Sequence, residues 1–205
     1  MYLTDFVKAI LDGHVVRPDE VYHHACIYCT SETCFGVVDK EPPIIAAGEA
    51  TGVVDNPDGK HMTIWTLDKA VRMAVKRGDL PSVCDLAMFD DSENCFTLAE
   101  LTETESKYLA DRVDGNGNTI PGKRTKAFNQ LKSTASKIEN LTGDFNTKTA
   151  VFFHRLPQSR NAIISRNANP FSAIAVNRVA YTLPKDDGFP DWIFKVHPFG
   201  QPFTV

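Results

Sequence analysis

The sequence predicts an α+β fold, with helices in the N-terminal and middle parts of the chain and an antiparallel sheet in its C-terminal third. Before Gly143, apolar side chains recur at the spacing that places them on one face of a helix. After Gly143 the spacing changes to every second residue, in segments rich in Phe, Val, Ile, Tyr and Trp and bounded by prolines. These segments are residues 150–156, 172–183 and 191–197. Helices followed by strands are typical of the α+β class.

The length and composition indicate a globular chain. With 205 residues, of which 42% are hydrophobic, it can bury a core as one domain. We therefore expect a single α+β domain over residues 1–205; a division into an acidic part (1–113) and a basic part (123–205) is the alternative. No apolar run approaches the about 18 residues of a membrane span, and the N-terminus lacks the pattern of a signal peptide. The expected location is the cytoplasm, without a membrane partner.

The first third of the chain is expected to mix helices and short strands. Residues 3–12 predict a helix, because their apolar side chains lie three and four positions apart. A proline followed by two acids opens a second expected helix, 18–28. Short strands are expected at 34–39 and 44–47, on either side of two prolines, and at 62–65 after a turn.

The middle of the chain is expected to contain three further helices. One begins after Thr66, a capping residue, and ends at Gly78. Another covers residues 102–113, because a Thr and a Glu at its start have the spacing of a capping box. The last covers 123–141. The loop 114–122 resembles the start of an EF-hand calcium loop, but it lacks the required glycine and glutamate, so we expect a turn.

Charge is distributed unevenly along the chain. Residues 1–105 hold 8 Lys/Arg and 19 Asp/Glu, whereas residues 106–205 hold 14 Lys/Arg and 7 Asp/Glu. No acidic residue lies between Asp144 and Asp186. A basic half of this kind favours a nucleic acid or an acidic protein surface as partner. The alternative is that the two halves pair, within the chain or between identical chains as a homo-oligomer.

The acid-free segment contains the tetrapeptide Ser-Arg-Asn-Ala twice, starting at Ser159 and at Ser165. On an extended strand this even spacing places both arginines on the same side. Arginine can donate two hydrogen bonds to one phosphate, and asparagine can bond to phosphate, sugar or base edges. The residues expected to bind nucleic acid are Lys148, Arg155, Arg160, Asn161, Arg166, Asn167 and Arg178.

A second cluster, residues 23–34, contains two histidines and three cysteines. Cys26 and Cys29 have the C-x2-C spacing with which two thiolates hold one ion, and Cys34 is close enough in sequence to be a third ligand. With His24, or its neighbour His23, they would complete a zinc site, and their spacing resembles the opening of a zinc knuckle. The alternative is that Cys26 and Cys29 lie on one buried helix face as small apolar residues. No cofactor other than Zn²⁺ is expected.

These patterns favour a non-enzymatic, nucleic-acid-associated protein that binds the phosphate backbone through its basic C-terminal sheet. One alternative is a regulator or inhibitor that docks a partner protein through charged surfaces. Another is a small phosphodiesterase or nuclease, in which His154 and His197 would be the acid and the base. The sequence contains no P-loop, no dinucleotide-binding fingerprint and no zinc-protease motif.

Overall fold

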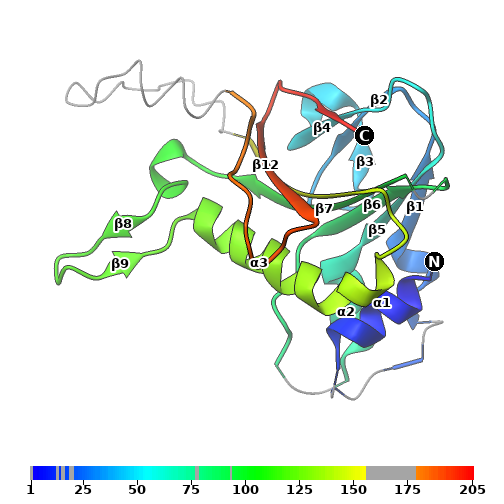
Figure 1. Cartoon of the computed structure of the whole chain (residues 1–205), viewed down its shortest axis with the longest axis horizontal. Helices are drawn as coiled ribbons and strands as arrows, with labels where there is room; N and C mark the ends of the chain where they lie inside the picture. The colour runs from blue at the N-terminus through cyan, green and yellow to red at the C-terminus, as the bar shows by residue number, and fades with distance from the viewer. Residues whose placement is uncertain are drawn as a thin grey trace.

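A mixed sheet of seven strands forms the centre of the molecule, with α-helices on one face and a four-stranded sheet on the other (Figure 1). This computed structural model describes residues 2–12, 14, 17–18, 21–76, 79–92, 94–155 and 179–205. Within these residues the helices are α1 (Leu3–Ile10), α2 (Leu67–Ala74) and α3 (Lys123–Ile138). None of the helices in this part of the chain is both long and apolar enough to cross a membrane.

The strands of the large sheet lie in the order β1-β5-β6-β7-β10-β12-β11. Their bounds are β1 Ile27–Thr30, β5 Met62–Thr66, β6 Leu86–Asp90, β7 Cys95–Glu103, β10 Thr147–Arg155, β11 Tyr181–Thr182 and β12 Trp192–Pro198. The small sheet consists of β13 (Phe203–Thr204), β4 (Gly52–Asp55), β2 (Cys34–Val37) and β3 (Ile44–Ile45), in that order. A separate hairpin, β8 (Arg112–Val113) and β9 (Thr119–Ile120), projects from the body (Figure 1).

The strand directions determine which residues share an edge of the large sheet. β5, β6 and β7 form an antiparallel meander, whereas β10 lies parallel to both β7 and β12. A parallel pair needs a crossover connection, and α3 is part of the connection from β7 to β10 and packs on both strands. The carboxyl ends of β7 and β10 and the start of β6 therefore lie at the same edge.

Two apolar cores lie on opposite faces of the large sheet. Along β7, Phe96 and Leu98 pack in the core beneath the helices, whereas Ala99 and Leu101 pack against the small sheet. This alternation follows from the two-residue period of a strand. Both faces of β6 are covered, because every one of its residues is buried.

The structure confirms the α+β class but corrects the position and type of the sheet. The large sheet extends over the whole chain instead of the C-terminal third, and its C-terminal part is parallel at β10 and β12. The sequence did not predict β6 and β7. Their residues alternate little between apolar and polar, because the central strands of a sheet covered on both faces need apolar residues on both sides.

Two predicted helices are wrong. Residues 18–28 contain a 3₁₀ turn, His24–Cys26, followed by β1. The capping-box residues of the predicted helix 102–113 instead continue β7, because Thr102 pairs with His154 and Glu103 with Arg155 in the parallel ladder. Pairing in the sheet thus outweighs a local helix signal. The helices predicted at 3–12, after Thr66 and at 123–141 are confirmed as α1, α2 and α3, and the strands at 34–39, 44–47 and 62–65 as β2, β3 and β5.

Candidate active site

An acidic cavity lies at the edge of the large sheet where β5 ends and β6 begins. It has a volume of about 230 Å³, and four carboxylates line it: those of Asp39, Asp68 and Asp85, and that of Glu41, which is paired with Lys69. A neighbouring, more open hollow of about 550 Å³ shares Asp39 and Asp68 and adds the cations Arg17 and Arg72. Carboxylates and cations therefore face one connected region of the surface.

Asp39, Asp68 and Asp85 come from different parts of the fold. Asp39 follows β2, Asp68 lies in the first turn of α2, and Asp85 immediately precedes β6. An acidic side chain in the first turn is stabilised by the positive end of the helix dipole. Asp68 also accepts a hydrogen bond from Arg72 Nε at 2.7 Å, one helical turn later. The cavity thus forms where the small sheet, α2 and the large sheet meet.

Asp85 lies opposite Glu100 of β7. The last ladder pair of β6 and β7 is Leu86 with Ala99, so the next position of the antiparallel register joins Asp85 and Glu100. β6 starts at Leu86, and the Asp85 carboxylate continues the pairing, because its Oδ2 accepts a hydrogen bond from the Leu101 backbone N–H at 2.7 Å. One Glu100 oxygen, Oε2, is buried and has no hydrogen-bond partner among the described residues.

Burial and mutual repulsion raise the pKa of both carboxyl groups. Burial raises the pKa of Asp85 to about 7; the Leu101 hydrogen bond opposes this rise, and the charges of Asp39 and Asp68 add to it. Burial, and after it the charge of Asp85, raise the pKa of Glu100 to about 9. Carboxyl groups that are this costly to ionise keep their protons near neutral pH unless a nearby cation offsets the negative charge.

The oxygen-rich cavity is suited to a hard divalent cation. Mg²⁺ is commonly held by one or two carboxylates, with water and substrate phosphates completing its shell. Asp85, which lines the cavity, and its register partner Glu100, which is not one of the lining residues, would supply two such carboxylates. In the described residues, no three His, Cys, Asp or Glu side chains form a ready metal cluster, so a cation here would take the remaining ligands from water and substrate.

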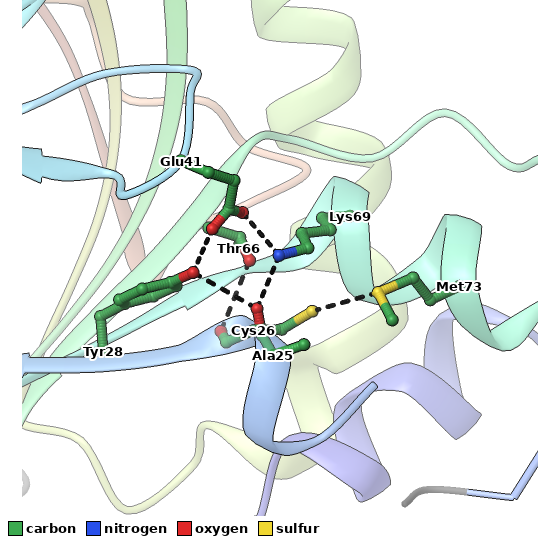
Figure 2. A network of polar contacts seen from close by, with 7 residues as sticks. All are labelled: Ala25, Cys26, Tyr28, Glu41, Thr66, Lys69 and Met73. Atoms are coloured by element: carbon green, nitrogen blue, oxygen red, sulfur yellow. Dashed lines mark hydrogen bonds and ion pairs between the residues drawn. The ribbon is translucent and has the colours of Figure 1, made fainter. Parts of the chain in front are cut away.

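Lys69, Glu41 and Thr66 line the cavity. They belong to a hydrogen-bonded network around Lys69 (Figure 2). The Lys69 Nζ donates to the Ala25 carbonyl at 2.7 Å and lies 2.8 Å from Glu41 Oε1. The hydroxyl of Tyr28 donates to the other Glu41 oxygen, Oε2. Beneath this network, Thr66 Oγ1 donates to the Cys26 carbonyl at 3.5 Å.

The residues predicted to bind nucleic acid are only partly described. Arg160, Asn161, Arg166, Asn167 and Arg178 lie outside the described residues. Their binding of nucleic acid stays a prediction.

Lys148 and Arg155 lie at opposite ends of β10, so the structure does not bring them together. Lys148 is buried, with its Nζ 3.6 Å from Asp191 Oδ2. Arg155 donates to the carbonyls of Ala50 at 2.8 Å and Gly48 at 3.5 Å, and it covers the ring of Phe199. Both cations therefore already contact groups of the protein, and their binding of nucleic acid also stays a prediction.

The four predicted zinc ligands are distributed over three elements. His24 and Cys26 belong to the 3₁₀ turn, and the buried Cys26 Sγ contacts Met73 Sδ at 3.9 Å. Cys29 is exposed on β1 of the large sheet, whereas Cys34 is exposed on β2 of the small sheet. Across the described parts of the chain, these side chains are not placed as a three-ligand group. Zinc binding stays a prediction.

The two histidines considered as acid and base lie on opposite faces of the large sheet. His197 pairs with Phe153, which packs against the small sheet, whereas His154 follows Phe153 and points to the other side. Burial lowers the pKa of His154 to about 4, with a contribution from the charge of Arg124. Burial also lowers the pKa of His197. These two imidazoles do not share a site.

Sequence reasoning missed the acidic cavity. One signal was present for Glu100, the register partner of the cavity residue Asp85, because it is the only charged residue in the apolar run from Cys95 to Leu101. A charged residue in such a run is unusual, since carboxylates are seldom buried without a partner. The contribution of Asp39 and Asp68 had no comparable signal, because both are far from Glu100 in sequence.

Comparisons with known proteins add no functional assignment. No protein-family model matches the chain, and no curated protein or solved structure matches it significantly.

Proposed function

We propose that this protein is a divalent-cation-dependent phosphodiesterase that acts on nucleic acid, with the acidic cavity as its active site. The observation that carries the proposal is the pairing of Asp85 with Glu100, two carboxyl groups with raised pKa values, where Asp85 lines a cavity with three further carboxylates. A strongly perturbed pKa in a cavity favours a functional site over a solvated surface.

The position in the fold supports the same conclusion. Ligands of sheets with parallel strands bind outside the carboxyl ends of those strands. Glu100 lies near the carboxyl end of β7, beside the parallel β10. β10 ends at Arg155, and the acid-free, arginine-containing segment follows directly in sequence. Nucleic acid, the partner predicted from that segment, is therefore the proposed substrate.

Different carboxylates would have different roles in the reaction. Asp85 and Glu100 would hold the cation, which would neutralise the phosphate and polarise the attacked P–O bonds. Asp39 or Asp68 would accept a proton from a water molecule as its oxygen forms a bond to phosphorus. The ester P–O bond would break, and the departing oxygen would take a proton from solvent.

The test is cleavage of single-stranded DNA, duplex DNA and RNA with Mg²⁺ or Mn²⁺. We expect cation-dependent cleavage in at least one substrate, reduced by about a hundredfold or more in Asp85→Asn and in Glu100→Gln. Asp144→Asn is the matched control, because Asp144 is exposed and lies outside the cavity. Absence of cleavage with either ion, or full activity in both Asp85→Asn and Glu100→Gln, would overturn the proposal.

A further inference from the structure

Lys69 is the cation that both hollows of the acidic region share. It lines the 230 Å³ cavity together with Asp39, Asp68 and Asp85, and it lines the 550 Å³ hollow together with Arg72. Its side chain is 34% exposed, so its ammonium group is neither buried nor fully solvated. It comes from the first turn of α2, directly after Asp68.

The neighbours of Lys69 hold its ammonium group in place (Figure 2). Glu41 uses one oxygen for Lys69 and the other for the hydroxyl of Tyr28. The Ala25 carbonyl is the second acceptor for Lys69, and the Tyr28 hydroxyl also approaches this carbonyl at 3.4 Å. A lysine side chain otherwise has several freely rotating bonds, so this network fixes a group that would sample many positions in water.

One donor of Lys69 remains for a ligand. An ammonium group carries three N–H donors. Glu41 and Ala25 take two of them, and these are the Lys69 contacts within the part of the chain that the structure describes. Lys69 shares the cavity with four carboxylates, those of Asp39, Glu41, Asp68 and Asp85. Its remaining N–H donor is suited to an anion whose oxygens can also bind a cation. A phosphodiester bound to a divalent ion fits this description.

We propose that Lys69 binds a phosphate oxygen of the nucleic-acid substrate in the acidic cavity, and that Glu41 and Tyr28 are positioning residues that hold it there. This inference rests on the proposed function, because Lys69 lines the same cavity as Asp85, which with Glu100 would hold the cation. It assigns the wall of the cavity formed by Lys69 to substrate binding and the carboxylate side to cation binding.

Arg72 is less suited to this role, although it also lies at the larger hollow. Its Nε is committed to Asp68 at 2.7 Å, and its side chain is 64% exposed. It does not line the smaller cavity that Asp85 lines. The exposed ion pair of Arg72 with Asp68 contributes little energy. Arg72 lines only the larger hollow, whereas Lys69 lines both.

The test measures binding of a short fluorescein-labelled single-stranded oligonucleotide by anisotropy, in Ca²⁺ over a series of salt concentrations. We expect Lys69→Met to weaken binding about ten- to a hundredfold and to reduce the slope of log affinity against log salt by about 0.7, as for one lost phosphate contact. Lys69→Arg should restore part of the affinity. Glu41→Gln and Tyr28→Phe should weaken binding less while leaving the salt slope unchanged, because they leave the ammonium charge present.

Lys76→Met is the matched control, since Lys76 is exposed just beyond the end of α2 and lines neither hollow. Mn²⁺ binding, followed by electron paramagnetic resonance, separates this inference from the proposed function. Retained Mn²⁺ binding in Lys69→Met together with weakened oligonucleotide binding supports the role of Lys69. Unchanged oligonucleotide affinity and salt slope in a folded Lys69→Met variant would overturn it, even where Mn²⁺ binds. Absence of Mn²⁺ binding in the wild-type protein would instead overturn the proposed function.

Discussion

Asp85 and Glu100 face each other across β6 and β7, one residue beyond the last ladder pair, with the Asp85 carboxylate bonded to the backbone N–H of Leu101. Two carboxyl groups in this arrangement cannot both ionise cheaply in a buried site. Their pKa values of about 7 and about 9 express that cost. The pair therefore needs bound protons or a bound cation to offset its charge. Cation binding by this pair should depend on pH.

The pH dependence of stability should show this cost. The folded-state pKa of Glu100 is about 9 against an ordinary value of 4.5, so the folded protein binds more protons between these values. The contribution of Glu100 to the free energy of unfolding is fully present below about pH 4.5 and is lost as the pH rises to about 9. Urea unfolding across this range should therefore show that the stability of the wild-type protein, minus that of Glu100→Gln, falls with rising pH. A pH-independent difference would show that Glu100 ionises at its ordinary pKa.

The buried imidazole of His154 should behave in the opposite way. It is 1% exposed, and neither ring nitrogen has a hydrogen-bond partner among the described residues. Its pKa is lowered from 6.5 to about 4, so its contribution to stability is present above pH 6.5 and is lost as the pH falls to about 4.

The substitution His154→Phe should remove this acid sensitivity. It should also stabilise the protein by about 1 kcal/mol or more at neutral pH, because it removes unsatisfied polar groups. Thermal unfolding at several pH values, with the exposed His24→Phe as control, checks both effects. A His154→Phe protein that is less stable than wild type at neutral pH would indicate that the imidazole has a partner.

Four of the five cysteines should separate into a fast and a slow class by reactivity. Cys29 and Cys34 are exposed, whereas Cys26 and Cys84 are buried. Burial also raises the pKa of the Cys26 and Cys84 thiols, which lowers the fraction of reactive thiolate. A disulfide reagent should therefore modify Cys29 and Cys34 rapidly, and Cys26 and Cys84 only as the protein unfolds. Rapid modification of Cys26 or Cys84 in the folded protein would contradict their burial.

The same assay tests the predicted zinc site. Zinc held by His24, Cys26, Cys29 and Cys34 would protect both rapidly reacting thiols, and a chelator would expose them again. An unchanged number of rapid thiols after incubation with zinc would contradict that prediction.

The sequence predicted those elements whose packing leaves a one-sided pattern. Helices α1, α2 and α3 each bury one stripe and expose the other, which gives the spacing of three and four. β6 and β7 were missed because layers on both faces remove the alternation. The predicted helix 102–113 was wrong because its capping residues pair with β10, which lies distant in sequence. Such non-local pairing is not encoded in local propensity.

The candidate site was less predictable than the fold. Asp39, Asp68 and Asp85 approach one another only because the small sheet, α2 and β6 meet at one edge. Lys148 and Arg155 were predicted to bind nucleic acid from charge alone, yet the fold gives both of them partners within the protein. Charge in a sequence indicates which side chains are available, whereas the topology decides what each of them faces.

The most direct test of the account is the pH dependence of Mn²⁺ binding to the purified protein, measured by electron paramagnetic resonance of the free ion. The wild-type protein should bind Mn²⁺ at about pH 8 and bind it more weakly at about pH 6, because the ion competes with the protons of Asp85 and Glu100. The double variant Asp85→Asn/Glu100→Gln should lose this binding, whereas Asp144→Asn should keep it. Mn²⁺ binding that is equal in the wild-type protein and the double variant, or no binding at either pH, would contradict the assignment of the acidic cavity as a cation site.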